Sequence, residues 1–254
     1  MRELRNAGIA KPVANPSANN RTPVKHSVEE RLSIGNLSAY ITDFKSTFTD
    51  LWSVVKAAIM VRQSERREAT IAAILKAARK LFSARGFDAT SMDEIAAGAG
   101  VAKGAVYHHF ESKEEIFTQV LEGVQAELAS RPTPPAILKM TDTLDQIAAL
   151  VLRYLIDANG PDFRRILLID GPVVIGWQKW REIDDRYFGA GARAAVETVL
   201  GSSAPIARVE AVTHLLMGAI MEACLVCAKS QEPKKSAREL SSALRLMLEG
   251  LRAA

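Results

Sequence analysis

The sequence predicts an all-α protein, with an N-terminal three-helix head joined to a C-terminal helical bundle. From about residue 37 onward, apolar residues recur three and four positions apart, which is the period of one helix face. No run alternates apolar and polar residues between turn signals, as an amphipathic strand would. Glycines and prolines divide the pattern into segments of helical length. We therefore expect helices joined by turns and no sheet.

The composition is typical of a globular protein of one or two domains. The 254 residues carry 33 basic and 29 acidic side chains, a net charge of +4, and 48% are hydrophobic, which argues against a disordered chain. The best apolar run, Leu215–Ala228, contains Glu222 and is too short to span a membrane. Cys224 and Cys227 cannot form a disulfide framework, and no signal-peptide pattern follows Met1. We therefore expect a cytoplasmic protein with no membrane partner.

Residues 1–60 are expected to be a flexible tail plus a helix. Residues 1–35 are rich in Pro, Asn, Ser and Lys and lack a helical period. An amphipathic helix is then predicted by Leu37, Ile41, Phe44, Phe48, Leu51, Val55 and Ile59. Translation from Met60 is the alternative, and the sequence leaves both open. Because most of the excess positive charge lies in these residues, bulk charge says little about the partner of the remaining chain.

Residues 61–115 contain the predicted head. Its first helix is indicated by an apolar face between Ile71 and Phe82 and stops near Gly86. Ser91-x-x-Glu94 is a capping box, in which the hydroxyl and the carboxylate bond free amides at the start of a second helix. Gly98–Gly100 then reverse the chain in a tight turn.

The third helix of the head, from about Ala102 to Phe110, has two different faces. Ala102, Val106 and Phe110 fall four apart and are expected to face inward. The opposite face is small, polar and cationic and consists of Lys103, Gly104, Tyr107 and His108. In a helix-turn-helix protein this helix enters the DNA major groove, where lysine reaches guanine acceptors and tyrosine and histidine bond phosphates. Close approach to DNA would justify the cost of Gly104, about 1 kcal/mol in helix propensity.

A second predicted capping box, Ser112-x-x-Glu115, begins the following helix. Lys113 then lies at the positive N-terminal end of that helix, where it can hold a phosphate. A two-helix hairpin with a glycine turn also occurs in helical proteins that bind no DNA. The two capping boxes, with Tyr107 and Lys113 in one register, favour DNA binding. Three arginines before the first helix fit either an arm along phosphates or a solvated helix start: Arg62, Arg66 and Arg67.

Across about Ser64–Phe117 the sequence resembles the tetracycline-repressor-like (TetR/AcrR) transcription regulators. The residues that carry the resemblance are Gly86, Phe87, Thr90, Ile95, Ala96, Ala99, Gly100, Val101, Gly104, Tyr107, Phe110, Ser112, Lys113 and Glu114. The resemblance implies base contacts from Lys103, Gly104 and His108, and phosphate contacts from Thr90, Tyr107, His109 and Lys113. Ser91 and Ala105 complete the expected DNA-binding set. The family often has Ser or Thr in place of Ala102, which puts one helix cap and one DNA contact in doubt.

Residues 116–254 are the predicted ligand-binding and dimerisation domain, with helices over about 136–158, 162–170, 172–200, 205–229 and 235–252. One recognition helix reads too few base pairs to select a genomic site, so we expect a homodimer. The resemblance implies a four-helix bundle of the last two helices and their mates. Two apolar stripes are candidates for this interface: Leu215, Leu216, Ala219 and Ala223, and Leu240, Leu244, Met247, Leu248 and Leu251. Alternatively, the stripes face the core of their own subunit.

The resemblance also implies an effector pocket among the middle helices, and Leu167–Asp184 looks like one recurring C-terminal type. The candidate ligand-binding residues are Tyr154, Asp170, Trp177, Trp180, His214 and Glu222. The polar candidates lie on apolar stretches, where a structural hydrogen bond is the alternative to a ligand. Cys224 and Cys227 lack a second ligand pair, which favours packing over a metal or redox site. We expect no cofactor.

These features predict a transcriptional regulator, a repressor that binds a palindromic double-stranded DNA operator as a dimer and is released by a small-molecule effector. An enzyme using Asp184, Asp185 or His214 is one alternative, but no HExxH, GxSxG or phosphate-loop motif supports catalysis. A helical protein that binds nucleic acid or a partner without sequence discrimination is the other.

Overall fold

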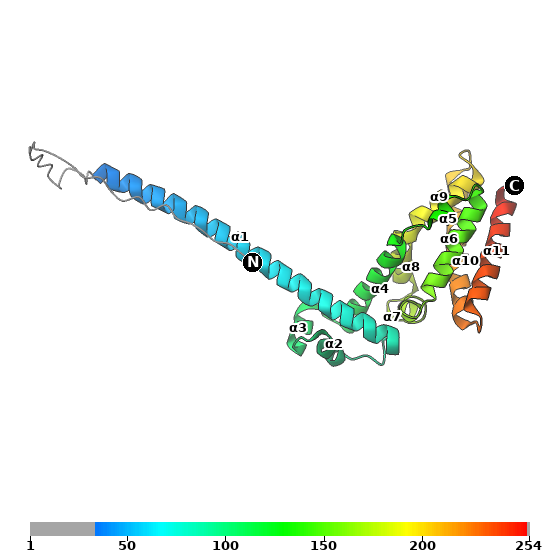
Figure 1. Ribbon diagram of the computed structural model, residues 1–254, viewed down its shortest axis with the longest axis horizontal. Helices are drawn as coiled ribbons and strands as arrows, with labels where there is room; N and C mark the ends of the chain where they lie inside the picture. The colour runs from blue at the N-terminus through cyan, green and yellow to red at the C-terminus, as the bar shows by residue number, and fades with distance from the viewer. Residues whose placement is uncertain (1–33, 253–254) are drawn as a thin grey trace, which may run out of the picture. The chain divides into compact units, whose positions relative to one another are not determined.

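A computed structural model describes residues 34–252, and every regular element in this range is a helix. The head contains α1 (Ile34–Arg85), α2 (Met92–Ala99) and α3 (Lys103–His109). The following elements are α4 (Lys113–Ser130), α5 (Pro135–Leu138), α6 (Thr143–Ala158), the π-helical η2 (Arg165–Asp170), α7 (Gly171–Val174), α8 (Trp177–Asp184), the π-helical η3 (Asp185–Gly189), α9 (Ala190–Leu200), α10 (Ile206–Lys229) and α11 (Pro233–Arg252). The predicted fold class is confirmed, and Figure 1 shows the elements.

The chain divides into two units, Met1–Val61 and Arg62–Ala254, and α1 contributes to both. Residues 41–61 are helical, as predicted, and their larger apolar side chains are all exposed: Ile41, Phe44, Phe48, Leu51, Trp52, Val54, Val55, Ile59, Met60 and Val61. The tail predicted over residues 1–35 lies almost wholly outside the described residues, as does the side chain of Leu37.

Because α1 is longer than the predicted first helix, three arginines lie inside it and do not precede it. They are Arg62, Arg66 and Arg67, and all three are exposed. They therefore lie within a helix and neither precede it nor start it. Whether these arginines contact phosphates stays a prediction.

Within the second unit, the head and the helices that follow it share one hydrophobic core. Ile74 and Phe82 of α1 pack in this core with Ile95 of α2 and Val106 of α3, and all four are fully buried. The rings of Phe82 and Phe117 of α4 meet edge-on, with their centroids 5.2 Å apart. Phe117 of α4 thus contacts the head from beyond residue 115, and the domain boundary near that residue stays a prediction.

Local hydrogen bonds end and begin the head helices where the sequence predicted. After α1, Gly86 has a φ of +86°, and its N–H donates to Phe82 O at 2.9 Å. At the start of α2 the Ser91 hydroxyl accepts from the Glu94 N–H, and the Glu94 carboxylate accepts from the Ser91 N–H at 2.9 Å. This capping box is complete, as predicted.

Two details of the predicted head are wrong. The Ser112 hydroxyl caps α4 by accepting from the Glu115 N–H at 3.0 Å, but the Glu115 carboxylate accepts from the Glu111 N–H, so the second capping box is only half formed. Ala102 is exposed and does not face inward, because it is the extended N-cap residue of α3 and lies outside the helical period. The buried face of α3 begins at Val106.

The last two long helices pack beside α6. Helix α6 contacts α11 along its length, and α10 contacts both α9 and α11, as Figure 1 shows for the helices near the C-terminus. The segment predicted over 136–158 is divided by Asp142, whose carboxylate accepts from the Asp145 N–H at 3.0 Å and caps α6. Gly176, with a φ of +79°, likewise interrupts the segment predicted over 172–200.

Helix α10 is the one helix among the described residues that is long and apolar enough to cross a membrane, judged by length and composition alone. Its inner side chains, including Leu216, Met221 and Cys224, belong to the shared core. A core helix of a folded domain passes the same test.

Candidate functional site

The helix-turn-helix is formed by α2, a turn at Gly100 and α3. Gly100 has a left-handed φ of +68°, and its N–H donates to Ala97 O at 3.2 Å. The predicted surface face of α3 is exposed in the structure and consists of Lys103, Gly104, Tyr107 and His108. The turn therefore presents one short polar helix face to solvent.

Lys103 is held in place at the start of α3. Its Nζ lies 2.7 Å from Asp93 Oδ1 of α2 and 6.0 Å from the centroid of the Tyr107 ring. The hydrogen bond and charge of Asp93 raise the pKa of Lys103, so its ammonium group is cationic at neutral pH. Because both members of this ion pair are more than half exposed, the pair contributes little stability, and the ammonium group of Lys103 is accessible to solvent.

Two residues expected to contact phosphate are instead bonded within the loop between α1 and α2. Thr90 is only 1% exposed, and its hydroxyl donates to Gly86 O at 2.8 Å. Lys113 Nζ donates to Phe87 O and Thr90 O, each at 2.9 Å, and lies 4.1 Å from the centroid of the Phe87 ring. Loop carbonyls need donors, and these side chains supply them. Thr90 is thus buried, whereas the half-buried Lys113 uses two of its ammonium donors within the loop, and the phosphate contacts of both residues stay predictions.

The remaining candidates differ in accessibility. Ser91 is exposed but engaged in its capping box, and Ala105 is half-buried. His109 is half-buried, with its ring centroid 5.1 Å from that of His108, and its Nδ1 has no hydrogen-bond partner among the described residues. A Cβ atom on Gly104 would meet nothing within 4 Å. The fold itself therefore does not require glycine at this position.

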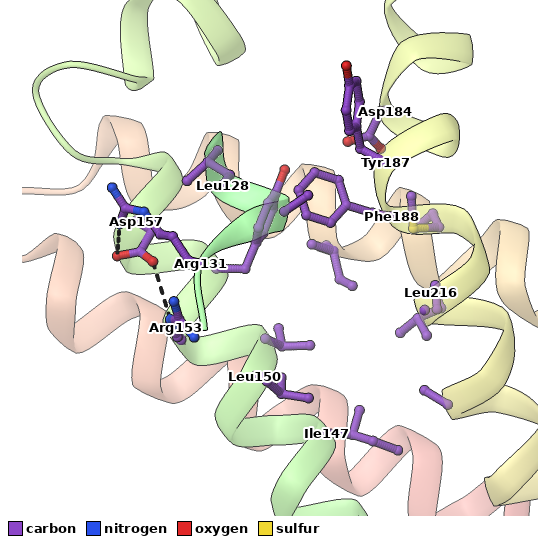
Figure 2. Close-up of a pocket in the computed structure, with 18 of the residues that line it drawn as sticks. Leu128, Arg131, Ile147, Leu150, Arg153, Asp157, Asp184, Tyr187, Phe188 and Leu216 are labelled. Atoms are coloured by element: carbon purple, nitrogen blue, oxygen red, sulfur yellow. Dashed lines mark ion pairs between the residues drawn. The ribbon is translucent and has the colours of Figure 1, made fainter. Parts of the chain in front are cut away.

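A second candidate site is a pocket of about 370 Å³ lined by α4, α6, the end of α8, η3, α9 and α10. Figure 2 shows Arg131, Arg153 and Asp157 on one side of it, and Asp184 and Tyr187 on another. Arg131 Nη1 lies 2.9 Å from Asp157 Oδ1, and Arg153 Nε lies 3.5 Å from Asp157 Oδ2. The two arginines thus share one carboxylate.

Asp184 is the buried carboxylate of this pocket and is only 4% exposed. Gln125 Nε2 donates to its Oδ1 at 3.3 Å, and Arg181 Nη1 lies 4.0 Å from its Oδ2. Burial raises the pKa of Asp184 to about 6, although the charge of Arg181 and the Gln125 hydrogen bond lower it. Burial and the nearby charge of Asp184 also raise the pKa of Tyr154.

Two family models match successive parts of the chain. "Bacterial regulatory proteins, tetR family" matches residues 74–120, which contain the helix-turn-helix. "Tetracyclin repressor-like, C-terminal domain" matches residues 144–251, and the two matches together cover more than half of the chain. The chain belongs to the TetR family. It is therefore a DNA-binding transcriptional regulator, as its resemblance implied.

Individual relatives support the same assignment. The transposon Tn10 TetC protein of Escherichia coli is 29% identical over 143 residues, which cover 54% of this chain and 69% of the relative. The regulator AcrR of Shigella flexneri is 30% identical over 95 residues, 37% of this chain and 44% of the relative. The repressor KstR2 of Mycobacterium tuberculosis is 46% identical over 50 residues, 20% of this chain and 25% of the relative. The last two matches span less than half of those relatives.

Solved structures of the family share the fold. A TetR-family regulator from Pectobacterium atrosepticum has a TM-score of 0.55 at 27% identity, with 74% of this chain and 96% of that chain covered. RolR in complex with resorcinol has a TM-score of 0.54 at 18% identity, with 75% and 94% covered. TetR-family regulators are not enzymes, which removes the catalytic alternative built on Asp184, Asp185 or His214.

The structure places one of the six candidate ligand-binding residues, Tyr154, in the pocket of this TetR-family protein. His214 and Glu222 are exposed on α10 and do not line the pocket. The sequence marked them correctly as polar residues on an apolar helix. It did not give the rotation of α10 about its axis, which turns them outward.

The other three candidates have structural roles. The Asp170 carboxylate accepts from the Phe87 N–H at 2.8 Å and so joins η2 to the head. Trp180 is buried and donates through Nε1 to Leu167 O at 2.9 Å. Trp177 is exposed and stacks on Trp180, with the ring centroids 5.3 Å apart. The structural hydrogen bond considered as an alternative for Asp170 is therefore present.

The charged and aromatic pocket residues that the sequence analysis missed as ligand candidates come from three helices and their ends. Arg131 ends α4, Arg153 and Asp157 lie on α6, and Tyr187 and Phe188 lie in η3. Each is surrounded in sequence by other charged or apolar residues, so no local pattern separates it from an ordinary surface or core residue. These residues can be recognised as pocket residues only because the fold brings them together around one cavity.

The predicted dimer stripes are divided between the core and the surface. Four of their residues are buried within the subunit, namely Leu216, Ala223, Leu244 and Leu248, and three are half-buried, namely Ala219, Leu240 and Leu251. Leu215 and Met247 are 73% and 65% exposed. Exposed rows continue from these two residues through Gly218, Glu222 and Val226 of α10 and Ala243, Leu246 and Gly250 of α11, and Glu222 is the charged member of the α10 row. The predicted stripes therefore mixed two faces of each helix.

Cys224 and Cys227 are fully buried in the core, as the packing interpretation predicted. Burial raises the pKa of both thiols, so they are protonated at neutral pH. No group of three or more histidine, cysteine or acidic residues that could hold a metal occurs in the part of the chain that the structure describes.

Proposed function

We propose that this TetR-family regulator is a homodimeric repressor that binds an inverted-repeat DNA operator and leaves it when a small molecule fills the pocket. The exposed face of α3 carries this proposal. This face presents the Lys103 ammonium group, which is paired with Asp93, together with Tyr107 and His108. Between them lies Gly104, where an added Cβ atom would meet no other atom within 4 Å. A short polar helix with an open backbone suits the major groove, where side chains and peptide groups both approach the bases.

Each head residue then has a distinct role in DNA binding. Lys103 and His108 contact base edges beside the Gly104 backbone, and Tyr107 and His109 bond phosphates. Ser91 and Ala105 border this surface at the start of α2 and on α3. Thr90 and Lys113 act indirectly, because their hydrogen bonds hold the loop that precedes α2.

The dimer forms through the exposed apolar rows of α10 and α11. Leu215 and Gly218 of α10 and Ala243, Leu246 and Met247 of α11 are exposed in the subunit. A second copy covers them by twofold symmetry, and the two α3 helices then read half-sites about one DNA turn, roughly 34–36 Å, apart.

Two connections link the pocket to the head. Helix α4 begins beside the α1–α2 loop. Leu128 in its last turn and Arg131 directly after it line the pocket. The Asp170 carboxylate holds the Phe87 N–H of the same loop. We expect two conformations of the dimer, one with the heads placed to bind DNA and one with the heads displaced. A ligand that binds more tightly to the displaced conformation lowers the affinity for DNA, and the limit is the ratio of the ligand's affinities for the two conformations. The regulator acts in the cytoplasm, and residues 1–60 lie outside this machinery.

Footprinting on the DNA around its own gene tests the proposal. We expect protection of an inverted repeat, and loss of that selectivity in Lys103→Ala with the fold intact. Lys234→Ala is the matched control. This substitution removes the same charge from an exposed lysine of α11, which is far along the chain from the helix-turn-helix. Uniform binding to unrelated DNA by the wild-type protein, or equal effects of the two variants, would refute sequence-specific recognition by α3.

A further inference from the structure

The charged groups of the pocket differ in how well they are compensated. Besides their ion pairs with Asp157, Arg131 Nη2 lies 3.6 Å from Glu127 Oε1, and Arg153 Nη1 donates to Pro132 O at 2.7 Å. The arginine side of the pocket therefore already has its acceptors. An anionic ligand would have to displace them.

Asp184 lacks comparable compensation. Its ion-pair partner is Arg181, whose Nη1 lies 4.0 Å from Asp184 Oδ2 and makes no hydrogen bond among the described residues, while Arg181 Nη2 donates to His214 O at 3.4 Å. The adjacent Gln125 is fully buried, and its Oε1 has no hydrogen-bond partner among the described residues. Gln125 Oε1 thus lacks a donor, and among the described residues the Asp184 carboxylate accepts one hydrogen bond, from Gln125. A buried carboxylate with a distant partner is unfavourable until a donor or cation reaches it.

Aromatic rings share the pocket with this carboxylate. Tyr154 and Phe188 meet edge-on with centroids 5.0 Å apart, and Tyr187 comes from the same stretch as Asp184. Much of the remaining lining is apolar and includes Leu216 and Met217 of α10. Aromatic faces attract cations through their negative π surface, and apolar walls bind a hydrocarbon body.

We propose that the pocket selects an amphipathic organic cation, whose ammonium group pairs with Asp184 and whose apolar body lies among the aromatic and aliphatic side chains. This inference rests on the proposed role of the pocket as the effector site. It adds the chemical class of the ligand. A neutral alcohol or phenol supplies one donor but no charge, and a carboxylate ligand places a second anion beside Asp184.

Calorimetric titration of the DNA-free protein with three matched probes tests the proposal: phenylbutylamine, phenylbutanol and phenylpentanoate. They share an aryl-alkyl body and differ in carrying a cation, a neutral hydroxyl or an anion. We expect the amine to bind at least about tenfold more tightly than the alcohol, and the carboxylate more weakly than both. In Asp184→Asn the amine should lose this advantage while the alcohol still binds.

The matched control is Asp185→Asn, which removes the same charge from the next residue, an exposed one that does not line the pocket. It should leave the tenfold preference unchanged. Absence of amine binding, equal affinities for amine and alcohol, or a preference that survives in Asp184→Asn would overturn the proposal. If the amine binds as expected but does not release operator DNA, the proposed derepression fails while the ligand class stands.

Discussion

Substituting Asp184 by Asn tests whether its buried carboxylate destabilises the empty protein. Burial raises the pKa of this group from the ordinary value of 3.8 to about 6. Each pKa unit corresponds to about 1.4 kcal/mol, so ionised Asp184 costs the folded state on the order of 3 kcal/mol above pH 6. Asparagine keeps an oxygen that can accept from Gln125 and carries no charge. We therefore expect Asp184→Asn to be more stable than the wild type at neutral pH.

The pH dependence has a definite sign. Between about pH 4 and 6 the folded protein holds a proton on Asp184 that the unfolded chain releases, so wild-type stability from this group falls as pH rises through that window. The stability advantage of Asp184→Asn should therefore be largest above pH 6 and shrink toward pH 4. Urea unfolding at fixed protein concentration, across this pH range, measures it.

The control is Asp185→Asn. It relieves no burial, because Asp185 is exposed, but it removes a charge that also raises the pKa of Asp184, so it should reproduce only a small part of this pH-dependent gain. An advantage of Asp184→Asn that is absent at neutral pH, or that grows as the pH falls, would refute the reasoning. It would mean that Asp184 is stabilised in its ionised form by contacts stronger than those with Arg181 and Gln125.

Three further changes test the packing of the fold. Gly86→Ala should lower the free energy of unfolding, measured in urea, by at least about 1–2 kcal/mol, because φ is +86° and the new Cβ would lie 2.8 Å from Arg165 Nε. An unchanged free energy of unfolding would contradict this loop geometry. Trp180→Phe should cost about 1–3 kcal/mol by leaving Leu167 O unpaired, whereas the exposed Trp177→Phe should cost less than about 0.5 kcal/mol; equal costs would refute the distinction. Removing residues 1–60 should leave the thermal midpoint and operator affinity unchanged, since the apolar side chains of residues 41–61 are exposed, and failure to fold would show otherwise.

The helix ends and the exposed face of α3 were predictable from the sequence, because each depends on residues only a few positions apart. Ser91 and Glu94 cap each other across three positions, and Gly86 ends α1 because its left-handed φ suits a residue without Cβ. Lys103 and Tyr107 share a face of α3 by helical spacing alone. Family resemblance did not show that Thr90 and Lys113 turn inward, because their acceptors are carbonyls of a folded loop.

By itself, the sequence determined the helical fold class, the helix-turn-helix and the family, because caps, turns and helical periods depend on residues three or four positions apart. Only the tertiary structure decided which sides of α10 and α11 are buried and which side chains form the pocket. Arg131 and Asp184 lie far apart in sequence, on helices whose rotation about their own axes is set by packing against neighbours. Such convergence leaves no local sequence pattern, so the exposed rows of α10 and α11 and the buried carboxylate can be identified only from the folded core.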